Sequence, residues 1–72
     1  MDPQMIDRLK SEVKELDTKL SALQRFIGSY EYSKIEITQR GLLLMQEKTM
    51  QDYLEIVSVR LQLMTKPTAR SL

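Results

Sequence analysis

Residues 6–27 read IDRLKSEVKELDTKLSALQRFI, and this stretch decides the fold. Its apolar residues recur at alternating spacings of three and four, which is a heptad repeat: Ile6, Leu9, Val13, Leu16, Leu20, Leu23 and Ile27. Such a repeat predicts a long helix that packs one apolar side against another helix. Pro3 suits the first turn, where a missing amide hydrogen costs nothing. We therefore predict a helix over residues 3–27, with Gly28 as its left-handed C-cap.

The second half of the chain predicts a second long helix over residues 37–64, ended by Pro67. Thirteen of the 23 residues in 42–64 are apolar, too many for one stripe. A helix that is apolar nearly all round is buried on several sides, so one partner helix cannot cover it. The side predicted to face the first helix is Leu43, Gln46, Met50, Tyr53, Val57, Arg60 and Met64.

The fold class that follows is all-α: a two-helix antiparallel hairpin that assembles into a helical-bundle homo-oligomer. The prediction is one domain over residues 1–65, with a connection at 28–36 and a flexible tail at 66–72. A chain of 72 residues without Cys has a small core and no disulfide to staple it. Oligomerisation is then the expected source of further buried area, with an oligomer core of Leu16, Leu20, Leu23, Leu43, Met50, Leu54, Val57 and Leu61.

The composition argues against catalysis. The chain has no His and no Cys, which excludes zinc-finger sites and every His-dependent or Cys-dependent catalytic arrangement. Gly28 and Gly41 are isolated, so there is no glycine-rich phosphate loop. Carboxylate pairs such as Asp52 and Glu55 fall on expected solvent faces. We predict a protein that is not an enzyme and has no metal and no cofactor.

The charge and hydropathy patterns argue against two classes of partner, duplex nucleic acid and membranes. Eleven Lys and Arg oppose ten Asp and Glu, with the signs interleaved along the chain. A binder of duplex nucleic acid needs a basic face, and none is visible. No window of 18 apolar residues is present, and no charged segment precedes an apolar one near residue 1, so we expect no signal peptide, no membrane partner and an intracellular location.

Two groups of residues could bind a ligand. Gln46, Tyr53 and Arg60 recur every seven residues; they either fix the register of the helices or line a cavity between subunits, where Arg binds phosphate and Tyr stacks on a base. The second group lies around the connection, next to the free amides that begin the second helix, and is either ordinary loop surface or a site for a small anionic nucleotide. It comprises Arg25, Tyr30, Tyr32, Lys34 and Arg40.

Several of these stretches resemble a known family. Residues 15–27 (ELDTKLSALQRFI), followed by Leu42-Leu43, Gln46, Met50, Tyr53-Leu54 and Arg60-Leu61, resemble the crAss-phage-related helical hairpins, a family of very short bacteriophage proteins. The resemblance covers residues 12–62, and Gly41 departs from it in the first turns of the second helix. The architecture is also similar to that of the phage anti-CBASS sponges, which sequester cyclic nucleotide alarm signals.

The resemblance implies a function. It implies a phage anti-defence protein in the cytoplasm of the infected bacterial host, a homo-oligomer that holds a cyclic nucleotide second messenger between its subunits without catalysis. The alternative is a small helical inhibitor or adaptor that blocks a host defence protein by direct contact. A third possibility is a purely structural oligomer of the virion or of replication.

Overall fold

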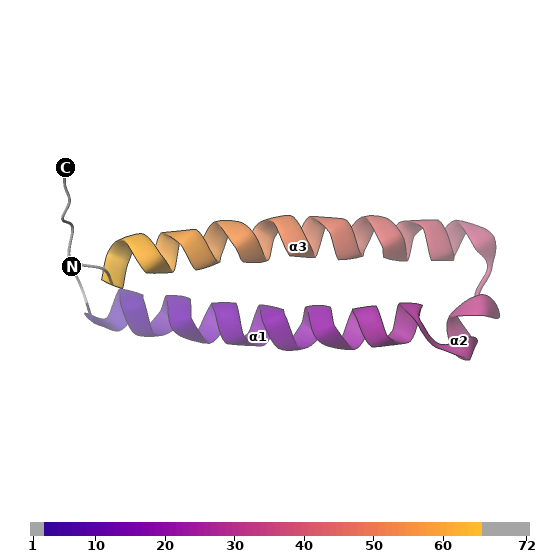
Figure 1. The fold of residues 1–72 in the computed structure, drawn as a ribbon, viewed down its shortest axis with the longest axis horizontal. Coiled ribbons are helices and arrows are strands. Elements are labelled where there is room, and N and C mark those ends of the chain that lie inside the picture. The colour runs from indigo at the N-terminus through magenta and orange to yellow at the C-terminus, as the bar shows by residue number, and fades with distance from the viewer. Residues whose placement is uncertain (1–2, 66–72) are drawn as a thin grey trace.

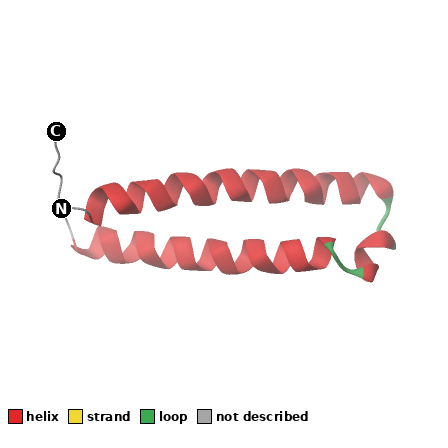
Figure 2. Ribbon diagram, in the orientation of Figure 1, coloured by secondary structure: helices red, strands yellow, loops and turns green. Residues whose placement is uncertain are grey.

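The fold is a helical hairpin, seen in a computed structural model that describes residues 3–65. Its elements are α1 (Pro3–Ile27), the short α2 (Tyr30–Ser33) and α3 (Ile37–Thr65). α1 and α3 lie antiparallel and side by side, and α2 lies at the end where the chain turns back (Figure 1). Residues 3–65 contain no strand (Figure 2), so the predicted all-α hairpin is confirmed. The tail predicted at 66–72 lies outside the described residues.

The apolar side of α1 is the predicted one. Leu9 and Leu20 are buried, and the remaining members of the repeat are half-buried against α3: Ile6, Val13, Leu16, Leu23 and Ile27. Charged residues such as Lys10 and Lys14 point to solvent, as a coiled-coil surface requires. The heptad spacing therefore identifies the side of α1 that packs in the hairpin.

The side of α3 that faces α1 differs from the prediction. The structure packs what we call the inner row: Arg40, Leu43, Glu47, Met50, Leu54, Val57, Leu61 and Met64. Val57 is fully buried and the other members are half-buried. The prediction that Gln46, Tyr53 and Arg60 lie on this side is wrong, since all three are exposed. The residue after each of them packs instead, which places Leu54 and Leu61 against α1 and keeps the amide and the guanidinium in water.

A second heptad row runs along the opposite side of α3. Each of its residues follows an inner-row residue by two positions, a rotation of about 200° on a helix of 3.6 residues per turn. This outer row comprises Leu42, Met45, Thr49, Asp52, Ile56, Val59 and Leu63. Its apolar members are between 46% and 72% exposed. α3 thus carries two rows at helical spacing, and the hairpin covers one of them.

The turn departs from the predicted loop in two ways. Gly28 has no positive φ, so it is not the left-handed C-cap that the sequence predicts. Its amide continues the helical pattern to the carbonyl of Gln24 at 3.1 Å, and the hydroxyl of Ser29 donates to the carbonyl of Phe26 at 2.6 Å. The chain then forms α2 inside the predicted connection. The turn is built from hydrogen bonds of helical type.

The residues predicted as an oligomer core lie between α1 and α3 of one chain. Leu20 and Val57 are buried there, and the others are half-buried: Leu16, Leu23, Leu43, Met50, Leu54 and Leu61. Their partial exposure is that of a single pair of helices, whose contact can cover only one side of each side chain.

Candidate functional site

Gln46, Tyr53 and Arg60 form a polar row along one edge of α3, which we call the flank row. Each member follows an outer-row residue by four positions, so Tyr53 lies next to Thr49, and Arg60 next to Ile56. Each member also precedes an inner-row residue by one. The flank row therefore lies between the contact with α1 and the exposed outer row, at the border of both.

A hydrogen bond across the hairpin fixes the centre of the flank row. The hydroxyl of Tyr53 donates to Oε2 of Glu12 on α1, and this bond, followed by partial desolvation and the charge of Glu12, raises the pKa of Tyr53. The positive charge of Arg60 acts in the opposite direction on the same group. Arg60 lies seven residues, about two helical turns, further along the same edge of α3, and Tyr53 is 43% exposed. An exposed ring and a guanidinium on the same edge of a helix suit stacking of a base together with binding of a phosphate.

The side chains at the turn have two different environments. Tyr30 is 72% exposed, and the ammonium of Lys34 lies 4.6 Å from its ring centre. Tyr32 is half-buried: its ring meets Phe26 edge-on at 6.2 Å, and its hydroxyl donates to the carbonyl of Arg40 at 3.0 Å. Tyr32 therefore ties the turn to the start of α3, while Tyr30 and Lys34 present a ring and a cation to solvent.

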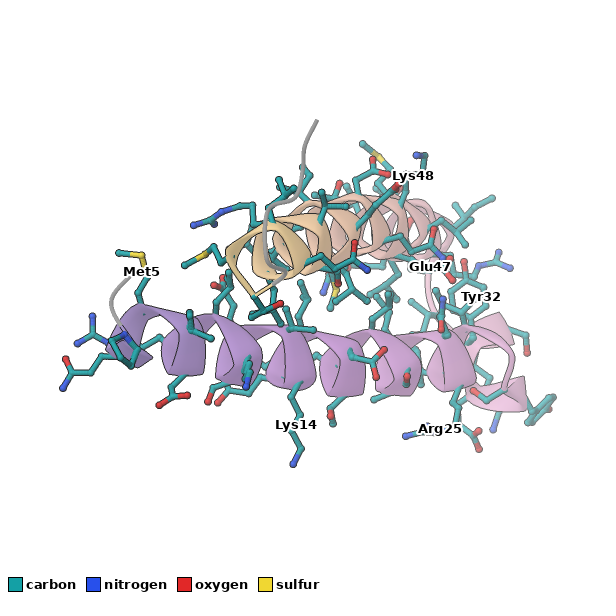
Figure 3. The ribbon with its side chains drawn as sticks, turned by 60° about the vertical axis from the view of Figure 1, so that its left-hand side comes forward. Met5, Lys14, Arg25, Tyr32, Glu47 and Lys48 are labelled. Carbon is teal, nitrogen blue, oxygen red and sulfur yellow. The ribbon has the colours of Figure 1, made fainter. Side chains whose placement is uncertain are left out.

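The side chains of Arg25 and Arg40 also have different environments, one pointing away from the hairpin and the other partly buried within it. Arg25 lies in the last turn of α1 and points away from α3, as Lys14 does (Figure 3). Arg40 lies in the inner row, and its Nε is buried without a hydrogen-bond partner within residues 3–65. The turn thus brings Tyr32 and Arg40 together, whereas Arg25 lies on the outer side of the hairpin.

The amides that begin α3 already have an acidic partner. Oε1 of Glu36 accepts a hydrogen bond from the amide of Gln39 at 3.2 Å. Hydrogen bonds from the amide and hydroxyl of Thr38, followed by the Gln39 amide, lower the pKa of Glu36, and Arg40 adds a smaller charge effect. Glu36 therefore occupies the place where the sequence predicts that a nucleotide phosphate could bind. This makes the flank row the stronger candidate site.

One shallow depression lies on α1 alone, at Ser11, Lys14, Glu15, Thr18 and Lys19. None of the predicted binding residues lines it, and α3 contributes nothing to it. In the part of the chain from 3 to 65, no three acidic side chains are grouped as metal ligands would be. No helix in the same part is long and apolar enough to cross a membrane.

Comparison with known protein families decides the assignment. The Sequestin family profile matches residues 3–63, which include α1, the turn and nearly all of α3. The chain belongs to the Sequestin family. No curated protein and no solved structure gives a significant match. The family name denotes sequestration, which agrees in this coarse respect with a protein that holds a ligand.

The Sequestin match spans both groups of predicted residues, from Arg25 to Arg60. The structure places Gln46, Tyr53 and Arg60 in one row along the edge of α3, and this row is separate from the residues at the turn. Sequence reasoning missed Glu12 as the partner of Tyr53. The available indication was its position on the edge of the α1 repeat, one residue before Val13.

Proposed function

We propose that this member of the Sequestin family is a non-catalytic sponge that binds and sequesters a cyclic nucleotide immune signal in pockets between subunits. In this proposal it is a bacteriophage anti-defence protein that acts in the cytoplasm of the infected bacterial host. Its partners are further copies of itself and the nucleotide. A sponge needs tight binding only, without stabilisation of a transition state.

The observation that carries the proposal is the position of the flank row beside the exposed outer row. A second subunit that covers Ile56 and its apolar neighbours would stand next to Tyr53 and Arg60. The two groups would then line the mouth of an interface instead of an open helix surface. Symmetry also multiplies each of these side chains, so that a short chain can build a complete pocket from few residues.

Nucleotide chemistry matches these side chains. The Arg60 guanidinium forms paired hydrogen bonds with phosphate oxygens, and the Tyr53 ring offers a face for a base. Gln46 carries an amide that both donates and accepts, as the edges of bases require. Tyr30 and Lys34 add an exposed ring and cation at the turn, 4.6 Å apart, where a second contact with the ligand or a neighbouring subunit can form.

The test is native mass spectrometry of the purified protein, alone and with a pool of 3′,3′-cyclic di-GMP, cyclic tri-AMP and cyclic ADP-ribose. We expect a homo-oligomer that gains whole nucleotides in a simple ratio to its subunits. Arg60→Ala should abolish the added mass while the oligomer persists. Lys14→Ala is the matched control, because it removes the same charge from a side chain that points away from α3 (Figure 3).

Two outcomes would count against the proposal. If Arg60→Ala dissolves the oligomer, the residue is structural and the assigned site is wrong. If the intact oligomer gains none of the nucleotides, the nucleotide function fails, and binding to a host defence protein, the alternative function, becomes the next measurement.

A further inference from the structure

The outer row of α3 has apolar ends and a polar centre. Thr49 and Asp52 form the centre, with two apolar residues before them and three after them: Leu42, Met45, Ile56, Val59 and Leu63. Each of the five apolar side chains is 46% to 72% exposed in the single chain. A helix face at heptad spacing with this exposure packs against another helix. Its near-symmetric pattern points to a copy of the same face.

We propose that α3 pairs with α3 of a second copy in antiparallel orientation, outer row against outer row. Each pair of chains then builds two equivalent nucleotide sites, with Tyr53 and Arg60 from one copy and Gln39 and Gln46 from the other. The pairing stands on the outer row alone, whereas the composite site rests on the proposed function.

Side-chain chemistry selects the register of this pairing. A heptad has two core positions, a and d, and in an antiparallel coiled coil each a residue of one helix faces a d residue of the other. The register that pairs most apolar surface sets Leu42 against Val59 of the second copy and Met45 against Ile56. The two-fold axis repeats both layers at the other end of the interface, so four apolar layers enclose the centre.

The centre of the interface then pairs polar with polar. Thr49 meets Asp52 of the second copy, twice, and the hydroxyl can donate to the carboxylate. Moving one helix by a heptad sets Asp52 against Ile56 and Thr49 against Val59. That shift buries a charge against an apolar side chain, a costly arrangement, so the first register is strongly preferred.

Charge complementarity along one edge supports the same register. Lys48 lies on the edge of α3 away from the flank row and points away from α1 (Figure 3). It pairs with its own Asp52 at 3.1 Å while staying 72% exposed, so its ammonium remains free to reach further. The antiparallel register places Lys48 opposite Glu55 of the second copy, again twice. The shifted register would place Glu55 opposite Glu55, and a parallel pair would place Lys48 beside Tyr53 of the second copy, where it has no acidic partner.

The other edge of the interface assembles the composite site. There Tyr53 comes to lie beside Gln46 of the second copy, and Arg60 beside Gln39. A phosphate on the Arg60 guanidinium and a base on the Tyr53 ring would meet amide groups from the opposite chain. Glu12 of the same chain holds the Tyr53 hydroxyl and so acts as a positioning residue.

The pairing is tested without ligand by sedimentation equilibrium at low salt. Lys48→Glu and Glu55→Lys should each weaken the dimer about tenfold, because two attractive pairs become repulsive. An equimolar mixture of the two variants should dimerise as well as the wild type, since every edge pair in the mixed dimer is attractive. Lys14→Glu, the same charge change on the outer side of α1, should leave the dimer unchanged.

A mixture that dimerises no better than the two variants alone would overturn the antiparallel pairing. The loss of the pair between Lys48 and Asp52 within one chain cannot explain a recovery, because mixing does not restore it. Ile56→Lys should also break the dimer, whereas Leu44→Lys, a comparable exposed leucine outside the outer row, should not. If Ile56→Lys and Leu44→Lys weaken the dimer to the same extent, the outer row is not the interface.

The composite site is tested by mixing Arg60→Ala with Gln46→Ala and measuring retained nucleotide from the same pool. Each variant alone should lose binding, because both of its sites are damaged. Half of the randomly formed dimers are mixed and hold one intact site, so about a quarter of the wild-type nucleotide load should return. If the wild type binds the nucleotide and the mixture shows no recovery, the whole site lies within one chain and the composite site is wrong. If the wild type binds nothing, the proposed function fails while the sedimentation result still decides the pairing.

Discussion

Val57 and Val59 provide a matched pair for measuring what holds the hairpin together. Val57 is fully buried in the inner row, whereas Val59, two residues later, is 46% exposed. Each change to Ala removes the same two methyl groups and gives the same gain of about 0.5 kcal/mol in helix propensity. The difference between the two variants therefore isolates burial against α1.

The magnitude follows from the burial. Removing two methyl groups from Val57 loses about 1.6 kcal/mol of transfer free energy, and the cavity raises the cost to about 2.5 kcal/mol. After the gain in propensity, Val57→Ala should lower the free energy of unfolding by about 2 kcal/mol. Val59→Ala loses about half of the transfer term and no cavity term, so its net effect in the single chain should be about 0.3 kcal/mol. A core of this size supplies only ~3–5 kcal/mol, so the first loss is a large fraction.

Urea unfolding followed by far-ultraviolet circular dichroism measures both changes, at several protein concentrations. The cost of Val57→Ala should persist at every concentration. The cost of Val59→Ala should grow as the concentration rises, because in the proposed dimer a second copy covers the outer row and stabilises the folded chain by mass action. If Val57→Ala costs no more than Val59→Ala at all concentrations, the packing of the inner row against α1 is wrong.

The remaining predictions concern the side of α1 that packs against α3, and the start of α3. Leu20→Asp should prevent cooperative folding, because it leaves an unpaired charge at a buried position of α1; a cooperative thermal transition would contradict this. Gly41→Ala should stabilise the chain by about 1 kcal/mol in urea unfolding, since Gly41 lies inside α3 and an added Cβ meets no atom within 4 Å. The lowered pKa of Glu36 stabilises the fold above its ordinary value of 4.5, and this contribution is lost as the pH falls through the lower folded pKa. Acid titration of the melting temperature should therefore show a smaller decrease for Glu36→Gln than for the wild type.

The sequence could predict the bounds of α1 and the side that it buries, because its heptad residues occupy one side only, although the predicted left-handed C-cap at Gly28 is wrong. On α3 the apolar residues occupy two opposite rows, so periodicity alone does not determine which row faces α1. The predicted side shares Leu43, Met50, Val57 and Met64 with the structure and errs by one residue at the alternate positions. The error places flank-row residues where Leu54 and Leu61 pack, and only the geometry of the pair distinguishes the two.

The candidate site shows the same division. The seven-residue spacing of Gln46, Tyr53 and Arg60 is visible in the sequence, and the row exists although it faces the edge of the hairpin. The bond between Tyr53 and Glu12 could not be predicted, because the two residues are 41 positions apart and meet only through the antiparallel register. The double role of Tyr32, which contacts both Phe26 and Arg40, depends in the same way on the fold of the turn.

In the proposed dimer, the position of the flank row would couple ligand binding to assembly. Tyr53 is anchored to α1 through Glu12, while its exposed side borders the outer row. A nucleotide that contacts both copies would bind the dimer more tightly than the single chain, so by linkage each bound nucleotide must tighten the dimer by the factor by which dimerisation tightens its binding. Dilution below the dimer dissociation constant should then weaken nucleotide binding and assembly together. Dilution that leaves nucleotide affinity unchanged would place the complete site within a single hairpin.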